Sequence, residues 1–219
     1  MRNILCLMLA CLLAACVRDK PNPISCDQIA TLRAQVGKET APEQFRDWVS
    51  RTYQLPSETI TIEAATGEAA KDGTVSVVRW HTDNFQYVAP LGDGAIRWLV
   101  VAGTNAPVDS LISCLGESTW YFVRSSGVES GVQRTVELFF PDQGIALSGW
   151  YYVPFNSQSQ PPAKSDRLFW DIMFMKSGPV EQVVNYYYAY DPALARDVLQ
   201  QIKPWPGEWA KIVFPPYPE

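Results

Sequence analysis

Eight short runs rich in β-branched and aromatic residues, in two groups of four, constrain the fold of this chain most strongly. Such runs favour β-strands. The first group is ETITIEA, TVSVVRW, FQYVAP and AIRWLVVAG, between residues 58 and 103. The second is TWYFVR, VQRTVELFFP, IALSGWYYVP and RLFWDIMFM, between residues 119 and 175. The turn sequences LGDG and PDQG predict antiparallel hairpins within the groups.

Helix-start sequences flank both groups of strands. Ser25 with Gln28 and Thr40 with Glu43 match the capping-box pattern. Gly116 is suited to end a short helix that begins near Asn105. Two further helices are predicted in SGPVEQVVNYYYAY and in DPALARDVLQQI, where Asp191 is the expected N-cap.

The order of elements predicts an α+β fold, in which antiparallel β-meander sheets carry helices packed on one face. Three helices open with similar proline motifs at Pro42, Pro107 and Pro179, 65 and then 72 residues apart. This spacing suggests two repeated helix-plus-four-strand units, although chance could also produce it. We therefore divide the domain into residues 25–104 as a first α+β unit, and 105–219 as a second unit with C-terminal helices and a Pro/aromatic tail.

The apolar run at the N-terminus predicts export. It spans about a dozen residues from Ile4 to Ala15 and follows Arg2, whereas a membrane-spanning helix needs about 20 apolar residues. A basic start, a short apolar centre and small residues before a polar region are typical of a secretory signal peptide. Residues 1–15 are therefore predicted to be a signal peptide.

The stretch Leu13-Ala14-Ala15-Cys16 resembles the lipobox of bacterial lipoproteins. The resemblance implies that the Cys16 thiol takes a diacylglyceryl group and becomes the mature N-terminus. Residues 16–24 would then be the lipid anchor and linker, and the protein would be extracytoplasmic, anchored by its acyl chains to the cell membrane or outer membrane. Ordinary signal cleavage nearby, without lipid on Cys16, is the alternative.

The segment VDSLISCLGESTWYFVRSSG…VELFFPDQGIALSG is similar to part of two protein groups. One is the small envelope lipoproteins of the outer-membrane assembly type, and the other is the related two-layer β-lactamase inhibitor proteins. In both, a short helix ends in Leu-Gly and leads into a strand meander, as at Leu115-Gly116 here. Ser118 departs from the proline common in that pattern. The resemblance implies a fold and carries no binding residue with it.

Length and composition indicate one folded domain or two small ones, without a nucleic-acid footprint. The 219 residues include 8 Trp, 10 Tyr and 9 Phe, and the net charge is −5 with both signs interspersed. This balance argues against nucleic acid as a partner and against electrostatic adhesion to anionic lipid. Membrane attachment would therefore rest on the acyl anchor.

The five cysteines predict one disulfide. Cys6 and Cys11 leave with the signal peptide and Cys16 is consumed by lipid, so Cys26 and Cys114 remain. In an exported, oxidising setting two such thiols usually pair. Two buried, unlinked thiols are the alternative.

Catalytic motifs are largely missing from the sequence. The single histidine, His81, argues against a histidine-based metal site and is expected to be a surface turn residue. The fragment GVESG around Ser130 lacks the spacing of a nucleophile elbow, and there is no cofactor fingerprint. We therefore predict no catalytic residue, no metal, no cofactor and no enzymatic activity.

Two groups of side chains could still carry function. Carboxylates on predicted strands could form a pair for glycoside chemistry, or could be ordinary solvated charges. The tail KPWPGEWAKIVFPPYPE could form a partner surface or pack on the sheet. Tryptophans on predicted strands are expected to be mostly core. The carboxylates are Glu58, Glu63, Glu137 and Asp171, the strand tryptophans are Trp80, Trp98, Trp120, Trp150 and Trp170, and the tail aromatic residues are Trp205, Trp209 and Tyr217.

These observations predict a membrane-anchored extracytoplasmic lipoprotein that acts as a non-catalytic binding or envelope-assembly module. Its sheet face or aromatic tail would contact another envelope protein or a cell-wall glycan. The alternative is a surface carbohydrate-active enzyme that uses paired carboxylates.

Overall fold

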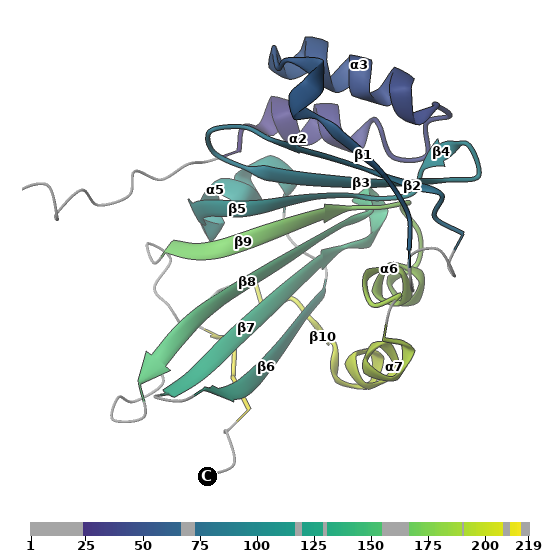
Figure 1. The fold of residues 1–219 in the computed structure, drawn as a ribbon. Helices are drawn as coiled ribbons and strands as arrows, with labels where there is room; N and C mark the ends of the chain where they lie inside the picture. Colours follow the sequence, from purple (N-terminus) through teal and green to yellow (C-terminus); the bar gives the residue numbers. More distant parts are fainter. Residues whose placement is uncertain are drawn as a thin grey trace, which may run out of the picture.

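A computed structural model describes residues 24–66, 73–116, 120–128, 131–154, 167–189, 191–207 and 211–215. Over these residues the chain forms one ten-stranded antiparallel sheet and five α-helices (Figure 1). The predicted α+β class is confirmed. Cys16, Ser118, Ser130, Trp209 and Tyr217 lie outside the described residues.

The elements follow the predicted order. The strands are β1 (Thr61–Ala64), β2 (Ser76–His81), β3 (Gln86–Gly92), β4 (Ala95–Ile96), β5 (Leu99–Pro107), β6 (Trp120–Val128), β7 (Gly131–Phe140), β8 (Ile145–Pro154), β9 (Arg167–Phe174) and β10 (Lys203–Pro204). The helices are α2 (Cys26–Arg33), α3 (Pro42–Tyr53), α5 (Val108–Leu115), α6 (Val180–Tyr187) and α7 (Pro192–Gln201), with 3₁₀ turns η1 (Ser57–Thr59) and η2 (Pro141–Gln143).

Two meanders join at the centre of the sheet. The strand order is β1-β2-β3-β5-β9-β8-β7-β6-β10, with β4 beside β3. The last strand of the first meander, β5, pairs antiparallel with the last strand of the second, β9. The boundary expected between residues 104 and 105 falls inside β5, so one sheet runs through both predicted units.

Helices cover both faces of the sheet, whereas we expected them on one. On the first face, α2, α3 and α5 pack over a core that includes Leu138 of β7, and on the second face α6 and α7 pack over a core that includes Phe139. Neighbouring strand residues point to opposite faces. Because consecutive residues at the end of β7 are both apolar, burying them needs a cover on each side.

The helix caps are mostly as predicted. Ser25 Oγ accepts from the Gln28 N–H at 3.2 Å while Gln28 Oε1 accepts from the Ser25 N–H at 2.9 Å. Asp191 caps α7 by accepting from the Leu194 N–H. The expected cap at Thr40 is wrong: Ala41 is the N-cap of α3, and Gln44 rather than Glu43 accepts from its N–H. Pro42 at the first helical position fixes this start, because it favours an extended residue before it.

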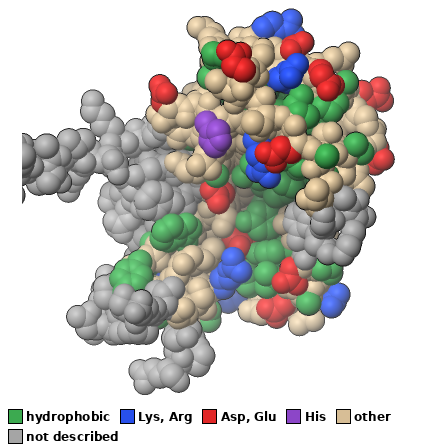
Figure 2. Space-filling model, in the orientation of Figure 1, with side chains coloured by type: hydrophobic (Ala, Val, Ile, Leu, Met, Phe, Trp, Pro, Cys, Tyr) green, Lys and Arg blue, Asp and Glu red, His purple; other side chains and the backbone are tan. Residues whose placement is uncertain are grey.

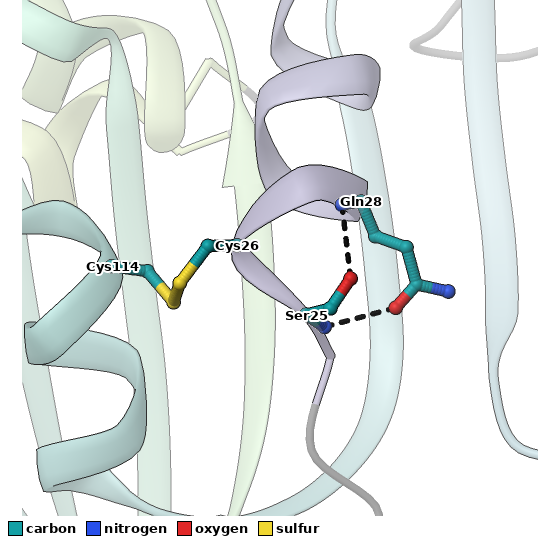
Figure 3. Close-up of a disulfide and its surroundings, with 4 residues drawn as sticks. All are labelled: Ser25, Cys26, Gln28 and Cys114. Carbon is teal, nitrogen blue, oxygen red and sulfur yellow. Dashed lines mark hydrogen bonds between the residues drawn. A yellow bond between two sulfur atoms is a disulfide. The ribbon is translucent and has the colours of Figure 1, made fainter.

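The predicted disulfide is confirmed. Cys26 at the start of α2 is bonded to Cys114 in α5, with the two Cα atoms 5.1 Å apart (Figure 3). The bond joins the N-terminal helix of the described domain to the helix between the two meanders, and it closes a sequence separation of 88 residues.

The strand tryptophans do not all lie in the core. Trp80 is fully buried, with its ring stacked on Tyr87 at 4.7 Å, and Trp98 and Trp120 pack partly buried over the second-face core. Trp150 is 41% exposed and is an exception to the expectation that these tryptophans are mostly core. By strand alternation it faces the second side with Ala146, but it is not part of the second-face core. The side chain of Trp170 lies outside the described residues.

The C-terminal segment crosses the first face of β6–β8, where it extends the core. β10 pairs with β6, and the Trp205 ring meets Tyr121 edge-on at 6.1 Å. Arg134, buried on β7, donates to the Pro215 carbonyl at 2.5 Å and lies over the Phe214 ring at 5.6 Å. This part of the tail therefore packs on the sheet, as one of the two sequence alternatives anticipated.

Candidate functional site

A row of polar side chains crosses three neighbouring strands where the second-face core ends. In the antiparallel register Glu137 of β7 pairs with Ser148 of β8, and Ser148 pairs with Asp171 of β9. Two strand spacings place the Cα atoms of Glu137 and Asp171 about 9.6 Å apart. On one side of this row α6 packs on the second-face core, and on the other side Trp150 and Tyr152 of β8 are exposed.

Glu137 forms the buried end of the row, with 1% of its surface exposed. The Tyr188 hydroxyl, just after α6, donates to its Oε2. Its Oε1 lies 3.7 Å from Arg124 Nη2 of β6, an ion pair longer than a hydrogen bond. Burial raises the pKa of Glu137, while the Tyr188 hydrogen bond and Arg124 oppose that rise. The carboxylate thus ties α6 to the sheet and holds Arg124 at the surface.

Asp171 forms the open end of the row. A bulge in the β5–β9 pairing between Val101 and Thr104 turns the Gly103 N–H toward its Oδ1, which accepts at 3.4 Å. Partial burial raises the pKa of Asp171, and the hydrogen bond from Gly103 opposes the rise. The Tyr187 hydroxyl hydrogen-bonds with Ser148 of the row. Burial is the largest cause that raises the pKa of Tyr187, and the charge of Glu137 raises it further.

Two aromatic side chains continue the site along β8. Trp150 and Tyr152 follow Ser148 at alternate positions, so all three lie on one face. They are 41% and 43% exposed. A Cβ at Gly131 would lie 2.6 Å from atoms of the Tyr152 ring, so glycine allows that ring to lie close over β7.

We call this surface the open face. It comprises Arg124 of β6, Gln133 of β7, Ser148, Trp150 and Tyr152 of β8, and Asp171 of β9, whereas Thr135 of β7, on the same side of the sheet, is buried. Figure 2 shows hydrophobic side chains on the arm of the sheet that ends at the tip of β8, and hydrophobic, acidic and basic side chains in the hollow between that arm and α7. A separate cavity of about 590 Å³ lies at the other flank of α6, where Arg97, Trp98, Glu181 and Asn185 line it.

The structure brings only two of the four candidate carboxylates together. Glu63 of β1 forms a surface ion pair with Arg79 at 3.3 Å, several strands from the row. Glu58 lies in η1 and not on a strand, so its predicted strand position is wrong. His81 is exposed, as expected, but it ends strand β2 instead of lying in the following turn.

Six residues of the site carried no prediction: Arg124, Gln133, Ser148, Tyr152, Tyr187 and Tyr188. Arg124 lies on the face of Glu137 through the register of β6 with β7. The alternation along β8 places Ser148, Trp150 and Tyr152 on one face, and that signal was available in the sequence. The Tyr186-Tyr187-Tyr188 run gave no such signal, because which tyrosine reaches Glu137 depends on how α6 docks.

Among the residues that the structure describes, no group of three or more His, Cys, Asp or Glu side chains could hold a metal ion. None of the described helices has the length and apolarity that a bilayer crossing requires.

No protein family, curated protein or solved structure matches this chain.

The accessible chemistry of the open face is that of a binding surface. Glu137 is too buried to touch a ligand, so its carboxylate positions other groups. Asp171 offers an acceptor, Arg124 offers donors, and the two aromatic rings offer flat apolar area.

Proposed function

We propose that this protein is a membrane-anchored extracytoplasmic binding module without catalytic activity, and that the open face is its binding surface. The observation that carries the proposal is the pair of exposed aromatic rings, Trp150 and Tyr152, beside a fixed polar row. Exposed aromatic side chains next to convergent polar groups are typical of binding sites. The lipobox-like stretch ending at Cys16 supports the anchor.

The open face is rigidly supported. At the polar row its strands β7, β8 and β9 are paired along both edges, with β8 paired to β9 as far as Trp150, and the Tyr188–Glu137 hydrogen bond fixes the end of α6 beside them. A surface that is already ordered loses little conformational entropy when it binds. This rigidity suits a module that presents one preformed surface to an envelope component.

The placement of Glu137 and Asp171 favours a second candidate, a surface carbohydrate-active enzyme. Both carboxyl groups have raised pKa values and lie on one row. Their Cα atoms are about 9.6 Å apart, and inverting glycosidases hold their two carboxyl groups roughly 6.5–9.5 Å apart. The burial of Glu137 argues against this candidate, because a general acid must reach the glycosidic oxygen. Release of products from an oligosaccharide by wild-type protein, but not by Asp171→Asn, would support the enzyme.

In-cell photo-crosslinking tests the binding proposal. A photoreactive amino acid at position 133 or 152 of the full-length protein should give discrete adducts with an envelope component. The same group at Glu63, on the far part of the same sheet face, or at Val213, 69% exposed on the tail, should not. Equal adducts at the control positions, or none at 133 and 152, would refute the proposal.

A further inference from the structure

We infer that the open face binds an uncharged polysaccharide chain, whose sugar rings stack on Trp150 and Tyr152 and whose hydroxyls bond to Asp171, Ser148 and Arg124. This inference rests on the proposed function and names the ligand class. Four features of the site support it: ring spacing, hydrogen-bonding groups, charge, and the position of the site within the sheet.

The aromatic rings match a chain of linked rings. Trp150 and Tyr152 occupy alternate positions of one strand, so their Cα atoms are about 7 Å apart along β8. The electron-rich face of an aromatic ring attracts the weakly positive C–H groups that a pyranose presents on its flat side. Two such rings, one on β8 and one lying over β7, would hold two units of an extended chain.

The polar groups match hydroxyls. Asp171 accepts and Arg124 donates, and the Ser148 hydroxyl, which already hydrogen-bonds with Tyr187, can make a further bond, so the site can satisfy hydroxyl groups in either role. These three residues lie on β9, β6 and β8, within the four consecutive strands β9-β8-β7-β6, next to the aromatic rings. A hydroxyl-rich ligand could therefore stack and hydrogen-bond at once.

The charge of the site disfavours polyanions. The described part of the open face holds one cation, Arg124, and Glu137 is its ion-pair partner. Phosphate-rich ligands and anionic lipid surfaces need clustered, uncompensated cations. With Asp171 on the same face, the site suits a ligand without negative charge.

The position of the site disfavours an added peptide strand. Strand addition needs a sheet edge with unpaired backbone groups. The polar row of the site lies on the interior strands β7, β8 and β9, each of which has a neighbour on both sides there, whereas β8 pairs with β9 only as far as Trp150. At the row only the side-chain face is available, and a rigid ring system can lie flat on it.

The test uses full-length protein in detergent micelles, titrated with three probes: cellohexaose, chitohexaose and, as the anionic comparator, a polyphosphate of similar length. Calorimetry should show that at least one uncharged hexasaccharide binds and that polyphosphate does not. Trp150→Ala and Tyr152→Ala should each weaken binding about tenfold or more, as expected for central aromatic contacts. Asp171→Asn should weaken it less.

Two variants control for unrelated effects: Glu63→Gln on β1 and Val213→Ala on the tail should bind like wild type. Unchanged thermal unfolding of each variant would show that the fold is intact. If neither hexasaccharide binds, or if Trp150→Ala and Tyr152→Ala bind like wild type, the glycan inference is wrong. If photo-crosslinks at positions 133 and 152 then identify a protein, the proposed binding function still holds, and if they too are missing, both fail.

Discussion

The Tyr188 hydroxyl donates a hydrogen bond to the buried Glu137 carboxylate. Removing this hydroxyl tests directly whether that bond stabilises the fold around the site. Replacing Tyr188 by Phe removes the donor to Glu137 Oε2 and keeps the ring. A hydrogen bond to a charged group contributes about 1.5–3 kcal/mol, so the variant should lose that much unfolding free energy in a urea titration.

Tyr186→Phe is the matched control for this prediction. Tyr186 lies two residues earlier and lines the cavity at the other flank of α6. Tyr186→Phe should unfold at nearly the same urea concentration as wild type. Equal destabilisation by Tyr186→Phe and Tyr188→Phe would mean that the hydrogen bond to Glu137 contributes no more to stability than the other tyrosine hydroxyl does.

Glu137 also predicts how stability depends on pH. Its pKa in the folded protein is raised above the ordinary value of 4.5, so the folded state holds its proton to higher pH than the unfolded state does. The resulting stabilisation is fully present below about pH 4.5 and is lost as pH rises through the raised pKa. Glu137→Gln should therefore show a smaller fall in unfolding free energy from pH 4 to pH 7. If the unfolding free energy of Glu137→Gln falls with pH as steeply as that of wild type, Glu137 does not titrate as a buried carboxyl with a raised pKa.

At the scale of elements, the disulfide links α2 to α5 across 88 residues. In the chain-entropy account, closing such a loop stabilises the fold by at most about 4.6 kcal/mol. The double variant Cys26→Ala/Cys114→Ala should unfold at clearly lower urea concentration. Alkylation of denatured, unreduced protein should label neither residue, whereas two labelled cysteines would show that the bridge does not form.

Most elements could be predicted because their signals are local. The capping box at Ser25, the cap at Asp191 and the eight strand runs each depend on a few neighbouring residues. The errors arise where distant parts meet. Helices α6 and α7 cover the second face because the apolar neighbours Leu138 and Phe139 need burial on opposite sides of the sheet. Which helix packs on which face depends on the complete sheet and cannot be read from a local pattern.

Prediction of the candidate site from local sequence is limited in the same way. Glu137 and Asp171 were candidates as strand carboxylates, but their shared row follows from the registers of β7, β8 and β9, which no local pattern fixes. The exposure of Trp150 likewise depends on where α6 ends over the sheet. Residue type alone made burial the natural expectation for a strand tryptophan.

At the scale of the whole molecule, Cys16 is predicted to determine where the domain works. A lipid-linked Cys16 would hold the domain, described from Ile24 onward, close to a membrane surface by a short linker. Cys16→Ser should shift the protein from the detergent phase to the aqueous phase in phase separation, and abolish the mass added by acyl chains. Partitioning like that of wild type would contradict lipidation.

The central claim is that the open face is covered by a ligand in the envelope, and thiol accessibility measures this directly. Full-length Gln133→Cys, on the open face opposite Tyr152, would be labelled with a membrane-impermeant maleimide in isolated envelopes and in purified form. We predict slower labelling of Gln133→Cys in envelopes than in purified protein, and equal rates in both for Asn185→Cys in the α6 cavity and Val213→Cys on the tail. Equal rates for Gln133→Cys in the two preparations, or protection at Asn185→Cys instead, would contradict the account.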